Sequence, residues 1–168
     1  MEVRFIRGAT RRYRSVFRRA DGVEVEFDGG GYNKVGGGEL PHDLAHLIVE
    51  DELGLERGVW GVMAAGGMFG HAKVVAGRRK PHAGARGRAI VAESSEAVMQ
   101  AEVIVRAVCD VAQTGDRGVL RRNVGERYRS ASVTGEAVDR AIERLRQAAA
   151  DWAALAAGEE LVYTYRRS

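Results

Sequence analysis

The stretch RYRSVFRRADGVEVEF, residues 12–27, decides the fold because apolar and polar side chains alternate on both sides of a turn signal. In RYRSVFR (12–18) and VEVEF (23–27), every second side chain lies on the same face of an extended chain, as a strand with one buried face requires. Asp21-Gly22 supplies the backbone freedom of a tight hairpin turn between them. The stretch therefore predicts two antiparallel strands.

Two further segments extend this sheet. EVRFI (2–6) alternates in the same way just before the hairpin, and LVYTYR (161–166) alternates near the other end of the chain. Gly158, upstream of the second segment, is placed to end a helix. Because the later strand has no local partner, we expect it to pair with the N-terminal strands. The sequence predicts a four-stranded antiparallel sheet, an N-terminal three-stranded meander plus a C-terminal strand.

The region between these strands changes to the period of helices. Ser94 is a predicted N-cap, and apolar residues follow at three- and four-residue steps through Cys109. A second helix with one apolar stripe starts near Thr134. Cys109 lies on the apolar stripe of the first helix, so we expect a buried core residue and not a nucleophile. Residues 1–168 are predicted to form a single α+β domain, with the small sheet packed against three or more helices.

Composition narrows the class of protein. The chain has 168 residues, of which 45% are hydrophobic and 29% charged, as in globular domains with a core. Its single cysteine excludes an internal disulfide and fits a reducing compartment. Arginines interrupt the first twenty residues, and no run of eighteen apolar residues follows. We expect a cytoplasmic protein with no membrane-spanning segment.

Glycine is concentrated in three connecting segments. DGGGYNKVGGGE (28–39) is predicted to be a mobile loop that enters the first helix. WGVMAAGGMFG (60–70) indicates a short helix or turn packed closely against a neighbour, and AGRRKPHAGARGR (76–88) an exposed basic loop. None of the three matches a phosphate-binding glycine motif in its strand-then-helix setting.

The most specific motif is PHDLAHLIVEDE, residues 41–52. A proline suits the start of a helix, and 100° per residue then places His42, His46, Glu50 and Asp43 along one edge. Apolar residues lie on both sides of that edge. The histidines are therefore predicted to be half-buried.

Two imidazoles four residues apart can reach one tetrahedral metal ion. We predict a divalent metal site, with zinc as the most suitable ion, in which His42, His46 and Glu50 are ligands. Asp43 is the candidate catalytic residue, as a base or as an orienting group. His71 and His82 are alternatives to Glu50 as the third ligand.

The HDxxH segment resembles the H-E-x-x-H helix of zincin metallopeptidases over five residues. His42 and His46 stand at the two ligand positions, and Asp43 replaces the glutamate that would activate a zinc-bound water. In the longer metzincin form of the motif, Val49 replaces a glycine and Glu52 stands where a third histidine would be. These departures argue against peptidase activity.

A wider resemblance covers the chain from residue 40 onward. LPHDLAH (40–46), the apolar Trp/Gly/Ala stretch after it, a last helix with Trp152, and Gly158 before an alternating strand resemble a family of small uncharacterised bacterial proteins. The resemblance implies an α+β fold and no particular activity.

Three functions remain open from the sequence. The first is a small metal-binding protein, including a metal-dependent hydrolase. The second is a protein-binding or regulatory module, in which His42 caps the helix start and His46 is a core histidine; its partner would be another protein or a second copy of the chain. The third, ranked last, is a nucleic-acid binder, because aromatic residues are not interleaved with the basic ones that would form it: Arg11, Arg12, Arg14, Arg78, Arg79 and Lys80.

Overall fold

The computed structural model describes residues 1–29, 31–78, 80–125 and 133–167. Its elements follow one another along the chain as β1 (Glu2–Arg7), β2 (Tyr13–Arg18), β3 (Glu24–Gly29), β4 (Tyr32–Val35), β5 (Gly38–Pro41), α1 (His42–Leu53), α2 (Val59–Ala64), β6 (Ala72–Ala76), α3 (Ala83–Glu93), α4 (Ser95–Thr114), α5 (Gly118–Asn123), α6 (Gly135–Ala154) and β7 (Glu160–Thr164). The α+β class predicted from the sequence is confirmed.

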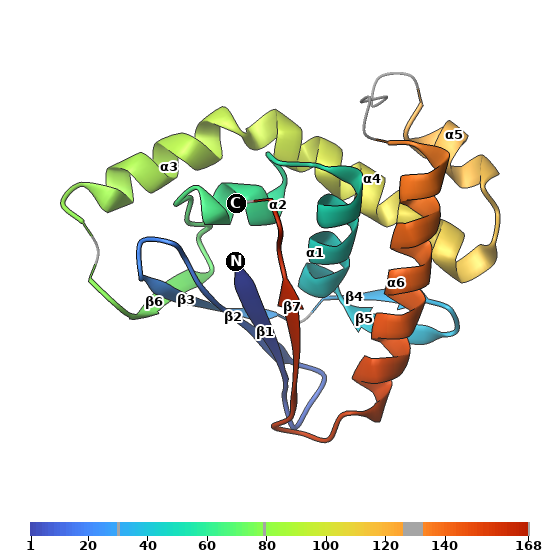
Figure 1. The fold of residues 1–168 in the computed structure, drawn as a ribbon, viewed down its shortest axis with the longest axis horizontal. Helices are drawn as coiled ribbons and strands as arrows, with labels where there is room; N and C mark the ends of the chain where they lie inside the picture. Colours follow the sequence, from blue (N-terminus) through green and yellow to red (C-terminus); the bar gives the residue numbers. More distant parts are fainter. Residues whose placement is uncertain (30, 79, 126–132, 168) are drawn as a thin grey trace.

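The main sheet is antiparallel throughout, in the order β6-β3-β2-β1-β7 (Figure 1). The predicted meander is present, and the turn between β2 and β3 contains Gly22 at a φ of +80°, as the hairpin signal requires. Strand β7 pairs with β1 and sets Tyr163 opposite Val3. The predicted return of the C-terminal strand to the meander is confirmed.

The sheet has one more strand than predicted. Strand β6 adds to the free edge of β3, with Phe27 opposite Ala72 and a bulge near Val25. Its residues, AKVVA, are few and largely exposed, so they carry no strong alternation. The edge position explains why this strand was missed, because an edge strand needs little apolar surface.

The glycine-rich segments are more ordered than predicted. Residues 32–41 form the hairpin β4–β5 instead of a loop, and Gly36 and Gly37 at its tip have φ values of +57° and +86°. Two successive positive φ angles are what a two-residue hairpin turn needs. The predicted basic loop over 76–88 is also partly wrong, because α3 begins within it at Ala83.

The two long helices begin and end close to their predicted limits. The Thr134 side chain accepts a hydrogen bond from the Ala137 amide and so caps α6. Ser94 is at the predicted boundary, but its side chain makes no cap bond, since α3 runs almost directly into α4 there. Cys109 is 1% exposed on the core face of α4, as expected. Burial also raises the pKa of its thiol to about 12, which leaves it protonated.

Helix α1 lies at the centre of the molecule. It packs against α6 and α4, and the sheet lies below it in Figure 1. Trp60 of α2 contacts Phe5, Phe17 and Phe27 of three neighbouring strands, with ring centroids 5.5–5.8 Å apart. This aromatic cluster joins the sheet to the helical layer.

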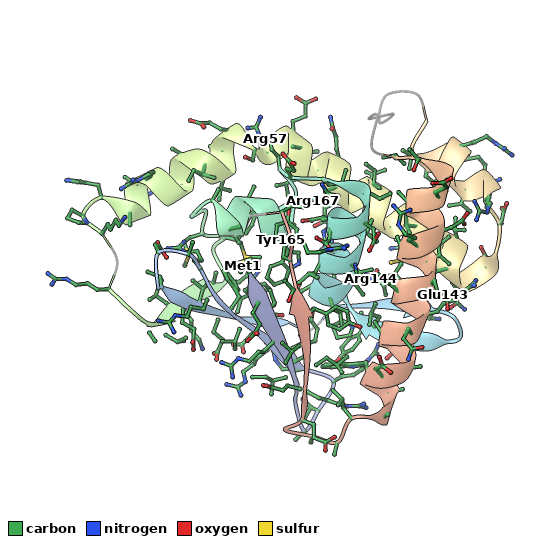
Figure 2. All side chains as sticks on the ribbon, in the orientation of Figure 1. Met1, Arg57, Glu143, Arg144, Tyr165 and Arg167 are labelled. Atoms are coloured by element: carbon green, nitrogen blue, oxygen red, sulfur yellow. The ribbon has the colours of Figure 1, made fainter. Side chains whose placement is uncertain are left out.

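The two ends of the chain meet beside α1. The Met1 ammonium donates to the Tyr165 carbonyl at 2.6 Å, and the Arg167 guanidinium donates to the Asp51 carbonyl at 2.8 Å (Figure 2). The Asp51 side chain is fully buried and accepts from Arg166 and Arg144. These contacts fix the C-terminal half of α1 against strand β7.

The solvent face of the sheet neutralises much of its own charge. Arg14 lies 3.1 Å from Glu26, which also pairs with Lys73 at 2.9 Å, and Arg4 lies near Glu24. Charged residues that alternate along the sequence thus pair across strands. Within the described residues, no helix combines the length and apolar character that crossing a membrane requires.

Candidate metal centre

Helix α1 carries both histidines and begins where the β4–β5 hairpin ends. Pro41 precedes the first helical residue with a φ of −47°, and the His42 amide donates to the Gly31 carbonyl at 2.9 Å. The helix ends at Gly54, whose φ of +67° favours glycine. This confirms the predicted helix start, with His42 in the first turn and His46 one turn later.

His42, His46 and Glu102 bring three possible metal-ligand atoms within 4.8 Å of one another. Glu102 Oε2 lies 3.1 Å from His46 Nε2 and 3.5 Å from His42 Nε2. Ligand atoms held about 2.0–2.1 Å from a tetrahedral zinc ion are roughly 3.4 Å from each other. The two distances to Glu102 are therefore close to the spacing that one metal ion imposes.

Packing of α1 against α4 produces this arrangement. The two imidazole rings are 4.5 Å apart between centroids and tilted by 58°. Glu102 lies on the exposed edge of α4, next to the core residue Ala101, and its side chain is 47% exposed. Solvent can therefore reach the cluster from the Glu102 side, whereas His46 is only 1% exposed.

Glu50, the predicted third ligand, lies on the other side of His46. Its Oε1 is 2.9 Å from His46 Nδ1, whereas Glu102 is next to Nε2 of the same ring. A carboxylate that accepts the Nδ1 proton fixes the tautomer and orientation of a histidine whose Nε2 binds metal. The structure thus gives Glu50 the geometry of a positioning residue and gives Glu102 the geometry of a ligand.

Glu50 also caps the N-terminus of helix α2. It is fully buried, and its two oxygens accept from the amides of Val59 at 2.8 Å and Trp60 at 2.9 Å. A Cβ at Gly58 would lie 2.4 Å from the Glu50 carboxyl carbon, so only glycine leaves room there. These bonds hold the carboxylate in place behind His46.

The hydrogen bonds of the cluster shift two pKa values in opposite directions. Burial favours the neutral ring of His46, but its bonds to Glu102 and Glu50 outweigh burial and raise its pKa to about 9. The bonds from His42 and His46 hold the pKa of Glu102 far below its usual range. A proton therefore occupies His46 at neutral pH, and a metal ion must displace it.

The pKa of His46 predicts how the stability of the metal-free protein depends on pH. Because this pKa is raised from 6.5 to about 9, its contribution is complete below pH 6.5 and is lost as the pH rises toward 9. Denaturant unfolding in the presence of EDTA should show that decline. It should be shallower for Glu102→Gln, which lacks one partner, and an unaltered slope in that variant would refute the assignment.

The His42 ring is held on its far side by Asn33. The Asn33 amide nitrogen lies 3.4 Å from His42 Nδ1, while Nε2 of the ring is next to Glu102. If the Asn33 amide is rotated by 180°, its oxygen accepts a hydrogen bond from a protonated Nδ1. The unprotonated Nε2 of His42 is then available as a metal ligand. Asn33 was not singled out from the sequence, and it lies in the hairpin that replaced the predicted loop.

Asp43, the candidate catalytic residue, lies in the same pocket as the cluster. Its carboxylate accepts from the Ser15 hydroxyl at 3.1 Å, and its own amide donates to the Tyr13 hydroxyl at 3.3 Å. Burial raises its pKa above the usual range, an effect that the Ser15 hydrogen bond reduces. A carboxylate with a raised pKa beside a metal site suits proton transfer.

A pocket of about 290 Å³ opens beside the three ligand atoms. The three cluster residues and Asp43 line one part of it, and its remaining walls are mostly apolar and aromatic: Phe27, Val59, Met63, Phe69, His71 and Val98. His71, one of the alternative third ligands, thus lines the pocket and is 5.5 Å from Phe27 between ring centroids. His82, the other, lies at the exposed start of α3 and outside this pocket.

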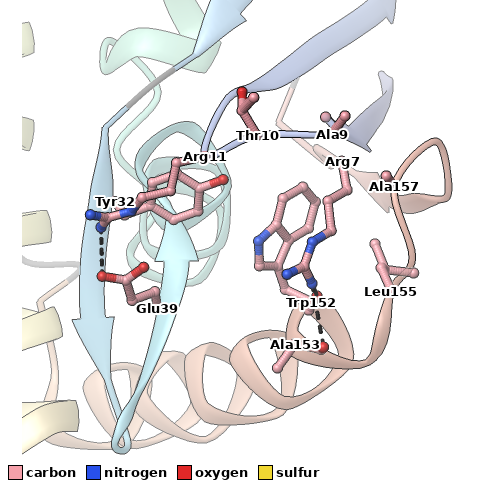
Figure 3. Close-up of a pocket in the computed structure, with 11 residues that line it drawn as sticks. Arg7, Ala9, Thr10, Arg11, Tyr32, Glu39, Trp152, Ala153, Leu155 and Ala157 are labelled. Atoms are coloured by element: carbon pink, nitrogen blue, oxygen red, sulfur yellow. Dashed lines mark hydrogen bonds and ion pairs between the residues drawn. The ribbon is translucent and has the colours of Figure 1, made fainter.

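A larger hollow of about 680 Å³ lies elsewhere, between the β1–β2 turn and the end of α6 (Figure 3). Its cations already have partners. Arg7 stacks over Trp152 and donates to that residue's carbonyl at 2.6 Å, and Arg11 lies over Tyr32 and pairs with Glu39 at 2.6 Å. The hollow therefore offers few free polar groups for a ligand.

Comparison with known proteins adds no assignment. No family model matches the chain, and neither a curated protein nor a solved structure matches it. The resemblances drawn from the sequence therefore stay predictions, and function is argued from geometry.

Proposed function

We propose that this protein binds one divalent metal ion through His42, His46 and Glu102 and uses it for hydrolysis. The observation that carries the proposal is the position of Glu102 Oε2, 3.1 Å and 3.5 Å from the two Nε2 atoms. Two histidines and a glutamate form a ligand set typical of catalytic zinc sites, which leave a fourth position open. The adjoining pocket provides that opening.

Zinc fits this donor set better than magnesium or calcium. Two imidazole nitrogens suit a borderline first-row ion, whereas magnesium and calcium prefer all-oxygen sites. Bound zinc lowers the pKa of a coordinated water and so supplies a nucleophile at neutral pH. The aromatic and aliphatic walls of the pocket would shield this site on the sides away from Glu102.

The protein's own residues have separate roles in this proposal. Glu50 orients His46 through Nδ1, and Asn33, with its amide turned over so that the oxygen accepts, would do the same for His42. Asp43 is placed to take a proton in the pocket, with its carboxylate held by Ser15. The substitution of aspartate for the zincin glutamate is compatible with this role, since the base here is fixed by its own hydrogen bond.

A metal-free role for the histidines is the competing function. It is favoured by the complete hydrogen bonding of His46, whose two ring nitrogens both have carboxylate partners. A protein of this kind would keep its fold without metal and act as a binding module. Metal content separates the two functions.

Zinc titration of EDTA-treated protein tests the binding, and zinc-dependent hydrolysis of p-nitrophenyl acetate tests the chemistry. We expect one zinc per chain and activity that chelation removes. Asp43→Asn keeps the Ser15 hydrogen bond possible, so it should retain zinc and lose hydrolysis about 10²–10⁴-fold.

The two measurements separate the parts of the proposal. Zinc binding without any hydrolysis would remove the hydrolase and leave a metal-binding protein. Absence of stoichiometric zinc would overturn the proposal and favour the binding module.

A further inference from the structure

A second pocket lies where the basic segment 76–88 meets the β2–β3 turn. It has a volume of about 110 Å³, and its lining includes Arg19, Asp21, Lys80 and Arg86. Three cationic side chains thus face one carboxylate. None of the metal-centre residues lines this pocket.

Arg19 lacks a partner for one of its nitrogens. Its side chain is only 5% exposed, and Nε and NH2 donate to Asp21 at 3.2 Å and 2.9 Å. Its buried NH1 has no hydrogen-bond acceptor among the described residues. A buried, charged donor without an acceptor lowers the stability of a protein. An acceptor from a bound ligand would remove that cost at NH1.

The single carboxylate of Asp21 does not balance the three cationic side chains of the pocket. Burial acts against its ionisation, but hydrogen bonds from the Val23 amide and from Arg19 hold its pKa below the usual range. Its negative charge is therefore already used by Arg19. Lys80 and Arg86 have no salt bridge among the described residues.

The start of helix α3 adds to this field. Ala83, the first residue of this eleven-residue helix, lines the pocket. The Ala83 amide donates to the Lys80 carbonyl at 3.1 Å, so the helix contributes to the pocket through its side chains and not through a free amide at Ala83. Arg86, in the same first turn, brings its guanidinium to the same wall.

Two glycines line the pocket. A Cβ at Gly66 would lie 3.8 Å from Arg19 NH1, so the chain at Gly66 passes close to this buried nitrogen. A Cβ at Gly87 would lie 2.8 Å from the Gly66 carbonyl oxygen, so α3 packs closely over this segment. The space suits one tetrahedral oxyanion.

We propose that this pocket binds phosphate, either as the free ion or as the phosphoryl group of a larger molecule. Arg19 NH1 and the Arg86 guanidinium donate charge-assisted hydrogen bonds, and Lys80 contributes a point charge. Among the basic residues that the sequence offers as a nucleic-acid surface, Lys80 lines this pocket. It does not depend on metal binding at the histidines.

Calorimetric titration with inorganic phosphate in EDTA, which removes metal as a competing site, tests the proposal. Lys80→Gln and Arg86→Gln should each weaken phosphate binding about tenfold, the usual effect of losing one charged contact. Arg88→Gln is the matched control, because Arg88 is exposed on the same helix and does not line the pocket. It should bind as the unaltered protein does.

Phenyl phosphate distinguishes the two sources of the ligand. Tighter binding than inorganic phosphate, lost in the same two variants, assigns the pocket to a phosphoryl group; weaker binding assigns it to the free ion. No saturable binding of either compound, or an equal loss in Arg88→Gln, would overturn the proposal.

Discussion

Glu102→Gln is expected to weaken zinc binding about a hundredfold or more, because it removes the anionic ligand and leaves a weakly coordinating amide. The expectation depends on the position of Glu102 Oε2, which lies within 3.5 Å of Nε2 on both histidines. The side chain is 47% exposed, so the variant should still fold, although it loses one charged partner of His46. Competition with a chromophoric zinc chelator measures the change.

Glu96→Gln is the matched control for that variant. Glu96 is an exposed residue of the same helix, and its carboxylate accepts a hydrogen bond from Gln100 four residues along. The substitution removes the same charge from α4 without touching the cluster. Equal affinities for the two variants would show that Glu102 acts only through general charge, and the ligand assignment would fail.

Glu50→Ala should cause the largest loss of stability of any substitution at the site. The change leaves the amides of Val59 and Trp60 and the Nδ1 atom of His46 without their buried acceptor. Breaking a buried charged network of this kind costs about 3–5 kcal/mol. That loss is a large part of the roughly 5–15 kcal/mol that stabilises a domain. Denaturant unfolding in EDTA measures it.

Two other variants complete the test of Glu50. Glu56→Ala removes an exposed carboxylate from the nearby turn and should change stability by no more than about 0.5 kcal/mol. Glu50→Gln keeps the shape and one acceptor, so it should lose less stability but bind zinc roughly 10- to 100-fold more weakly. If Glu50→Ala unfolded as easily as Glu56→Ala, the role of Glu50 as a buried acceptor would be wrong.

The sheet could be predicted because its signal is local. Alternation in residues 12–27 fixes which face is buried, and the alternation before Thr164 requires a partner that the N-terminal strands offer. Strand β6 lacks that signal because it is a short edge strand. The sequence does not predict the β4–β5 hairpin, because a glycine-rich segment is typical of a mobile loop, whereas Gly36 and Gly37 form the hairpin turn.

The site could be predicted only as far as one helix extends. The four-residue spacing of His42 and His46 places them together, and the structure confirms that they are neighbours. Glu50 has the same spacing from His46, but both Glu50 and Glu102 are within reach of that ring. Which of them faces Nε2 depends on how α1 packs against α4, and no local pattern records that packing.

Anomalous diffraction at the zinc edge from crystals of the zinc-loaded protein tests the central claim most directly. We predict one strong peak about 2.0–2.2 Å from His42 Nε2, His46 Nε2 and a Glu102 oxygen, with Glu50 still bonded to His46 Nδ1. A peak at other residues, or His46 still hydrogen-bonded to Glu102 with no peak between them, would contradict the proposed metal centre.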